Sequence, residues 1–325
     1  MRVAVAATVT WIAYDGGSYN VSSWTSLGIV TWWTVAVGLA LGVWRRRSIG
    51  PAAAVVAGAF TLFAFYSGLS ALWASGAGQP IEAMGRVLLY VGVLVLAYAA
   101  GTPRSLGRWC DGIAAGLSAI AVLAVLSRLF HGSFGDDAAL RFLPDATTRL
   151  SYPVAYWNGL AVLVALACPL LLRAATVSHR RLGALALAPI PVIAATIYLA
   201  SSRSGAVTAA VGICAFAALA GRRRIAVLAA AVAVLATVAA VVVVSTQHAL
   251  VNGPLDSAAA ASDGRRMTLA LVLLAAATSA LHAILVPRVE RLRIDRRLVR
   301  AAAVVAVVLV AVAVASGHPV ARWHS

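Results

Sequence analysis

The sequence predicts an all-α, polytopic integral membrane protein. Of its 325 residues, 62% are hydrophobic and only 11% are charged, whereas soluble globular domains carry about 45–50% apolar and about 25% charged residues. The apolar residues are gathered into long runs, which short stretches of charged and turn-forming residues separate. A single soluble core cannot bury so much apolar surface, so we expect the runs to be membrane-spanning helices.

Eleven apolar runs are candidates for these helices, because a span needs roughly 20 mostly apolar residues, or about 17 at the lower limit. The first run is short. We expect a short or tilted helix there rather than a signal peptide, because Tyr14–Tyr19 offers no small-x-small cleavage site. Charge and turn clusters bound the eleven runs, which cover residues 3–14, 25–44, 51–74, 84–101, 109–130, 156–175, 182–200, 205–220, 225–246, 267–287 and 301–316.

Arginine placement predicts the orientation, because cytoplasmic loops retain basic residues and exported loops lose them. With Arg2, alternate connections hold 18 arginines against three acids, which leaves +15 of the net charge of +16 on one side and +1 on the other. We therefore expect a cytoplasmic N-terminus, an exported C-terminus and a multi-pass domain over residues 1–316 in the inner membrane. The basic residues form short clusters and no single stripe, which argues against nucleic-acid binding.

Two exported connections are long, residues 131–155 and residues 247–266. The first ends in Arg149–Gly159, where Tyr152, Tyr156 and Trp157 stand at the mouth of the sixth run. Such aromatic residues are typical of a plain interfacial belt. The alternative is an exported groove in which the rings lie against sugars or lipid head groups and Arg149 faces an anion. The second connection, with its alanine-rich stretch, reads as a mostly flexible connector.

Arg203 is the strongest candidate for a functional residue. It lies in Ser201–Gly205, a polar break between two apolar runs, where a tight hairpin needs only small polar residues. One interpretation is a guanidinium that reaches lipid phosphates at the membrane surface. We favour a bidentate clamp on a phosphate or pyrophosphate, the geometry that suits arginine best. Arg265, beside Arg266 at the start of the tenth run, is either an interfacial anchor or a further anion contact.

The sequence lacks the patterns of the common metal and nucleotide sites. The three cysteines form no Cys-x-x-Cys pair, and no histidines have metal-ligand spacing. There is no Walker motif, no glycine-rich nucleotide loop and no Asp-x-Asp. We therefore expect no metal, no cofactor and no cytosolic nucleotide donor. His282, inside the tenth run, reads as a packed helix residue rather than a proton relay.

Three stretches together resemble the O-antigen ligase and polymerase family of bacterial envelopes: the Tyr14–Tyr19 loop, Arg149–Gly159 entering a helix, and Tyr198–Gly205 leaving one. The resemblance implies a metal-independent glycosyl transfer at the exported face, from an undecaprenyl-pyrophosphate-linked glycan to an acceptor glycan or glycolipid. It also implies that Arg203 engages the pyrophosphate. Members place a second arginine and a histidine base in a large exported loop.

Residues 317–325 look like the opening of that loop, so we expect an incomplete catalytic loop and assign no role to His318 or His324. The other functional hypothesis is a secondary transporter or flippase. Such a protein would carry ionisable or helix-breaking residues near the bilayer midplane. Pro169, Pro189 and Pro191 break helices, but the charges gather at the ends of the runs.

Overall fold

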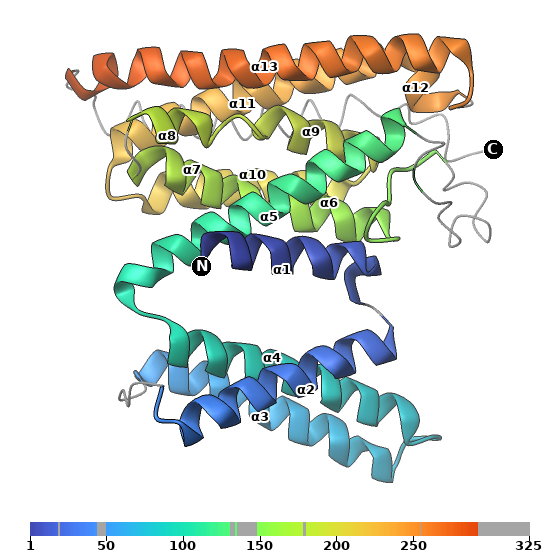
Figure 1. Ribbon diagram of the computed structural model, residues 1–325, viewed down its shortest axis with the longest axis vertical. Coiled ribbons are helices and arrows are strands. Elements are labelled where there is room, and N and C mark those ends of the chain that lie inside the picture. The colour runs from blue at the N-terminus through green and yellow to red at the C-terminus, as the bar shows by residue number, and fades with distance from the viewer. Residues whose placement is uncertain are drawn as a thin grey trace. The chain divides into compact units, whose positions relative to one another are not determined.

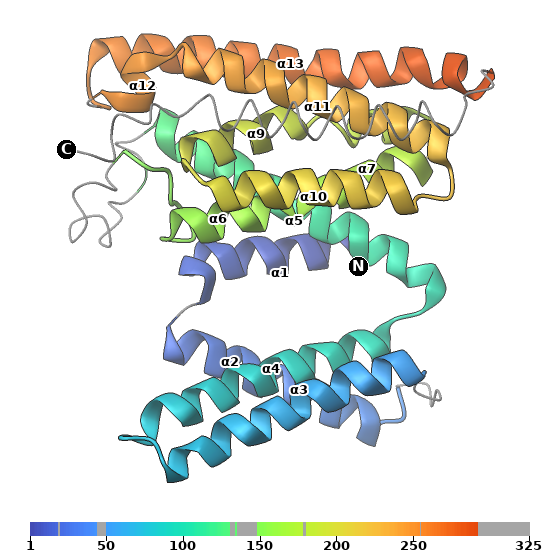
Figure 2. The ribbon, with the colours of Figure 1, turned by 180° about the vertical axis from the view of Figure 1, so that it is seen from behind.

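The computed structural model describes residues 1–18, 20–43, 50–130, 134, 148–177, 180–253 and 255–291. In these ranges the chain is helical and has no β-strand, which confirms the all-α class. The chain divides into two compact units (Figures 1 and 2). The smaller comprises Asp15–Arg108, and the larger combines Met1–Tyr14 with the chain from Trp109 onward.

Seven described helical stretches are long and apolar enough to cross a membrane. They are Ala53–Leu72, Gly78–Ala100, Ser105–Leu129, Trp157–Val177, Leu182–Leu199, Arg223–Ser245 and Ala258–Arg291. Arg2–Tyr14 and Arg203–Leu219 are shorter apolar helices. Each of the first ten predicted runs overlaps a helix. The eleventh, residues 301–316, and the expected loop opening, residues 317–325, lie outside the described residues.

The smaller unit is built around α4, which packs against α2 and α3. Indole rings of α2 rest on glycines of α4. A Cβ atom at Gly85 would lie 2.8 Å from the ring of Trp24, and one at Gly92 would lie 3.0 Å from Nε1 of Trp32. The unit consists of η1 (Gly16–Ser18), α2 (Val21–Ala40), α3 (Pro51–Leu69), η2 (Ser70–Leu72) and α4 (Gly78–Ala100). The glycines of α4 thus leave room for the indole rings of α2 where these two helices pack.

The larger unit holds the remaining helices. They are α1 (Arg2–Tyr14), α5 (Pro103–Leu129, from Trp109 onward), α6 (Trp157–Ala165), α7 (Ala167–Val177), α8 (Arg180–Leu185), α9 (Ile190–Leu199), α10 (Arg203–Leu219), α11 (Arg223–Ser245), α12 (His248–Asn252) and α13 (Ala258–Arg291). Within it, α6 packs against α9 and α10, and α11 packs against α9 and α13. Both views show α13 running along α11 (Figures 1 and 2).

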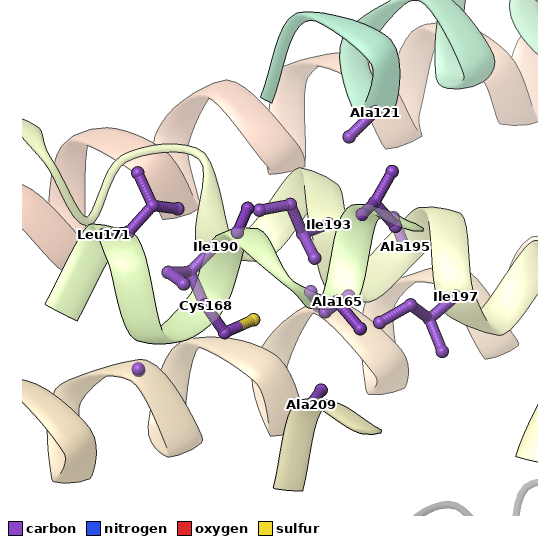
Figure 3. Close-up of a cluster of buried hydrophobic side chains, with 14 of the residues drawn as sticks. Ala121, Ala165, Cys168, Leu171, Ile190, Ile193, Ala195, Ile197 and Ala209 are labelled. Atoms are coloured by element: carbon purple, nitrogen blue, oxygen red, sulfur yellow. The ribbon is translucent and has the colours of Figure 1, made fainter. Parts of the chain in front are cut away.

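Small residues dominate the core of this unit. Ala121 of α5, Ala165 of α6, Ala195 of α9 and Ala209 of α10 lie among isoleucine and leucine side chains (Figure 3). Short side chains let helix backbones approach closely, which strengthens van der Waals packing where lipid supplies no hydrophobic drive between helices. Close packing therefore fixes the relative positions of these four helices.

The sixth and seventh predicted runs are each divided into two helices. The sixth changes from α6 to α7 at Leu166, and Pro169 lies in the first turn of α7. The seventh contains α8 and α9 with a turn over residues 186–189, and Pro191 follows at the start of α9. Proline has no N–H to donate and is tolerated in a first helical turn, where that donor is unpaired in any case.

Ion pairs gather at one end of the larger unit. Asp111 of α5 binds Arg2 of α1 at 2.8 Å and Arg173 of α7 at 3.2 Å. Close by along α7, the carbonyl of Thr176 accepts a hydrogen bond from Arg222 at 3.0 Å, and the same guanidinium lies 3.4 Å from Glu290 of α13. Charges that the arginine pattern assigns to one side of the membrane are therefore neighbours in the fold.

Candidate functional site at the Arg203 end

The hairpin before α10 is tight and polar. α9 ends at Leu199, and α10 begins at Arg203. Ser201 adopts a left-handed backbone with φ of 50°. Ser202 is the N-cap, and its hydroxyl accepts a hydrogen bond from the Gly205 N–H at 3.2 Å. The cap satisfies one of the unpaired N–H groups at the helix start, so the polar residues of this hairpin have a structural use.

Arg203 does not have such a use as a cap. It is the first residue of a 17-residue helix, and its side chain is exposed. The helix dipole makes a helix N-terminus favourable for anions and unfavourable for cations. An arginine here adds positive charge to an end that is already positive. The arrangement is therefore a poor helix start and a good place for an anion.

The second candidate motif lies directly against this hairpin. The N–H of Leu150 donates to the carbonyl of Leu199 at 3.0 Å. A turn follows, in which the Ala155 N–H donates to the Ser151 carbonyl at 3.0 Å and the bond between Tyr152 and Pro153 is cis. The structure thus brings together two motifs that are far apart in the sequence.

The helices that follow the two motifs are also in close contact. A Cβ atom added to Gly205 of α10 would lie 2.5 Å from Cβ of Ala161 and 3.0 Å from its carbonyl carbon. Only glycine fits at this crossing without a shift of α6 or α10. Because Trp157 begins α6 and Arg203 begins α10, this crossing holds the two helix starts near each other.

The predicted aromatic residues pack in two groups. Arg149 places its guanidinium carbon 5.2 Å from the centroid of the Trp157 ring, a cation–π arrangement. The rings of Tyr156 and Trp157 lie 5.4 Å apart. Tyr156 is exposed, whereas Trp157 is half-buried. These three residues therefore form one surface at the start of α6.

Tyr152 belongs to a second group that sequence reasoning did not assemble. Its ring packs edge-on against Tyr14 at 6.4 Å and against Phe134 at 5.3 Å. Burial raises the pKa of Tyr152, and a hydrogen bond with Tyr14 raises it further. The phenol therefore stays neutral and keeps its donor. Tyr14 was visible as the start of the Tyr14–Tyr19 loop, but no sequence signal links it to Tyr152.

Arg265 is not joined to this pair of motifs. It is exposed in the third turn of α13, a helix that packs chiefly on α11 and α12. The expectation of a mostly flexible connector before it is wrong, because α12 occupies residues 248–252 and α13 already begins at Ala258. The side chain of Asp263 accepts a hydrogen bond from the Ala249 N–H at 3.0 Å and ties the two helices together.

Arg128 of α5 also holds α12 in place, and sequence reasoning missed this role. The residue is only 6% exposed. Its Nε donates to the Leu250 carbonyl at 3.0 Å, and its Nη2 donates to the Val251 carbonyl at 3.1 Å. A charged residue in the last turn of an apolar run was the available signal. Its partners could not be foreseen, because α12 is too short to give a sequence pattern.

Within the described ranges, no three His, Cys, Asp or Glu side chains come together in a way that could hold a metal ion. His248 is exposed at the start of α12. His131, His318 and His324 lie outside the described residues. The described residues that the structure brings together at the Arg203 end carry guanidinium groups, hydroxyls and aromatic rings.

No family model, curated protein or solved structure significantly matches this chain. The likeness to O-antigen ligases and polymerases thus rests on the short motifs themselves.

Proposed function

We propose that this protein is a multi-pass inner-membrane ligase or polymerase for lipid-linked polysaccharide. Its exported end would bind an undecaprenyl-pyrophosphate-linked glycan and, with a complete catalytic loop, pass the glycan to an acceptor glycan or glycolipid. The observation that carries the proposal is the hydrogen bond from Leu150 to Leu199, which joins the Arg149 and Arg203 motifs at one end of the larger unit.

The proposed reaction is a displacement at the anomeric carbon. The acceptor hydroxyl forms a new glycosidic bond, the bond from the sugar to pyrophosphate breaks, and the hydroxyl proton passes to a general base in the expected exported loop. Negative charge grows on the departing polyprenyl pyrophosphate. A fixed guanidinium at Arg203, with the N-terminus of α10 behind it, would stabilise that charge without a metal.

Arg149 would assist from the neighbouring motif. The cation–π contact holds its guanidinium over the Trp157 ring, and N–H groups of this cation would donate to an oxygen anion. The exposed ring of Tyr156 and the neutral phenol of Tyr152 would lie against sugar rings or lipid head groups. Arg265 would make a more distant anion contact from the start of α13.

The orientation is part of the proposal, with eleven spans, a cytoplasmic N-terminus and an exported C-terminus. Support comes from the ion-pair cluster of Arg2, Asp111 and Arg173, which gathers charges from three helices at the arginine-rich end of the unit. By the same alternation, the starts of α6 and α10 face the exported side.

The test is binding of a polyprenyl pyrophosphate to the purified full chain in nanodiscs of zwitterionic lipid. We expect Arg203→Ala to weaken binding by about tenfold or more, since a charge-assisted contact contributes about 1.5–3 kcal/mol. Arg149→Ala should weaken it less, and Arg203→Lys should restore it only in part, because lysine cannot bind two oxygens side by side.

Arg223→Ala is the matched control. Arg223 is also an exposed arginine at the first position of a long helix, α11, but it lies at the other end of α10 from Arg203. Its loss should leave affinity unchanged. Equal affinity of wild type and Arg203→Ala would remove the clamp hypothesis, and equal weakening by Arg223→Ala would reduce it to non-specific attraction between arginine and phosphate.

A further inference from the structure

His282 is a buried polar group that the proposed function does not use. It lies on α13 and is only 1% exposed, and among the described residues neither Nδ1 nor Nε2 has a hydrogen-bond partner. Ser279 lies three residues earlier on the same helix and is 9% exposed, and its hydroxyl likewise has no partner in the described part of the chain. Positions three residues apart share one face of a helix. Two buried polar side chains with unmet hydrogen-bonding capacity therefore stand next to each other.

Ser279 differs in this respect from other buried hydroxyl residues of the unit. Thr278, its neighbour, donates to the Leu274 carbonyl at 2.6 Å, and Thr196 donates to the Val192 carbonyl at 2.9 Å. A Ser or Thr in an apolar helix usually satisfies its hydroxyl in this way. The Ser279 hydroxyl does not, so its hydrogen-bonding capacity remains open to another group.

We propose that Ser279 and His282 form a buried binding site for a water molecule inside the larger unit. A neutral imidazole offers one donor and one acceptor, and a hydroxyl offers both kinds of site. A direct bond between the two side chains would satisfy only one ring nitrogen. Water supplies both donors and acceptors, and buried waters typically bind groups of this kind with about three hydrogen bonds.

The helix geometry fits one bridging molecule. Side chains three residues apart have Cβ atoms about 5–6 Å apart. The Ser hydroxyl oxygen and the imidazole nitrogens extend beyond these Cβ atoms, and one water can reach both through hydrogen bonds of about 2.8 Å. A metal ion fits the pair poorly, because one imidazole and one hydroxyl are too few ligands, and no described group of three His, Cys, Asp or Glu residues exists to complete them.

The site lies near the basic end of α13 and uses none of the residues of the proposed function. Six residues separate His282 from Arg288, which corresponds to about 9 Å along a helix, and Pro287 removes one backbone donor in between. Seventeen residues, or about 26 Å, separate His282 from Arg265 at the other end of the helix. The inference is therefore independent of the proposed function.

A double-mutant cycle on the full chain in detergent tests the site, with the thermal unfolding midpoint as readout. We expect Ser279→Ala and His282→Leu each to lower the midpoint by a few degrees, because each leaves the water with too few partners to stay bound. The double variant should be no less stable than the weaker single variant, since the second change then removes a site that is already empty.

Thr278→Val is the control, because the Thr278 hydroxyl has its own partner and its effect should simply add to that of His282→Leu. Unchanged or higher midpoints for His282→Leu, or additive effects of Ser279→Ala and His282→Leu, would overturn the proposal. A wild-type density map that resolves ordered water gives a second measurement. Density within hydrogen-bonding distance of Ser279 Oγ and an imidazole nitrogen supports the site, and direct contact of the side chains without it refutes the site.

Discussion

At the scale of single residues, two arginines with similar sequence settings differ in their surroundings. Both Arg128 and Arg203 adjoin the end of an apolar run. Arg128 is buried and donates to two backbone carbonyls, whereas Arg203 is exposed at a helix start. The Arg128 guanidinium holds α12 in place through these two hydrogen bonds. The Arg203 side chain lies at the surface of the larger unit, where the proposed function places an anion.

Arg128→Ala should destabilise the protein and loosen α12. The change removes two charge-assisted hydrogen bonds and leaves the carbonyls of Leu250 and Val251 short of a donor, which typically costs about 1–3 kcal/mol for each buried group left unpaired. Hydrogen exchange of residues 248–252 and the unfolding midpoint measure the effect. Arg265→Ala, at an exposed site, should alter neither quantity, and a stable Arg128→Ala variant with a protected α12 would contradict this role.

Sequence reasoning selected Arg203, Arg149 and the aromatic residues as candidates from their local sequence settings alone. An arginine is unnecessary in a short polar hairpin, and the sequence alone shows that Arg203 is unusual there. The pairing of Leu150 with Leu199 and of Tyr152 with Tyr14 was not visible. These contacts depend on how the helices cross, which local pattern does not encode.

At the scale of helices, the first helix shows how a short apolar run is kept in place. α1 lies on two glycines of α5. A Cβ atom at Gly112 would lie 2.8 Å from the Arg2 carbonyl oxygen, and one at Gly116 would lie 2.9 Å from the Ala6 carbonyl oxygen. The glycines are four residues apart and open one face of α5 to the backbone of α1. Arg2 then binds Asp111 beside them.

Gly116→Ala should therefore lower the unfolding midpoint, although alanine is the better helix former. The new methyl would meet backbone atoms of α1, which cannot rotate away. Gly58 of α3 is the matched control, because a Cβ atom there meets nothing within 4 Å. Gly58→Ala should leave stability unchanged or raise it by up to about 1 kcal/mol. If the two substitutions had the same effect, the close approach of α1 to α5 would be disproved.

Helix positions followed from the sequence better than helix interruptions did. Runs of apolar residues located ten helical regions, because burial in lipid requires such runs. The break at Leu166 lies close before Pro169, one of the prolines that the sequence analysis named as helix breakers. The helix α12 was not foreseen. It depends on tertiary contacts, as the buried side chain of Leu250 illustrates at 2% exposure. A five-residue helix is not stable alone and forms only where its neighbours complete it.

At the scale of the whole molecule, the arginine pattern predicts which ends of the helices face the cytoplasm. Alkaline phosphatase fused after Ser325 should be active, because that enzyme works only on the exported side, and green fluorescent protein fused there should be dark. Fusions after Arg224 should give the reverse result. Fluorescence from the fusion after Ser325 would contradict the eleven-span topology and, with it, the exported position of Arg203.

The crossing of α6 and α10 has a consequence for any ligand of the Arg203 end. Gly205 meets Ala161 through main-chain and Cβ atoms, which have no rotamers to exchange. The spacing between the two helix starts is consequently set by van der Waals contact between α6 and α10 at this crossing. A molecule that spans both motifs must match this length as it arrives. Selectivity by ligand size would then come from the crossing of α6 and α10 at Gly205 and Ala161, and neither of these residues contacts the ligand in the proposed function.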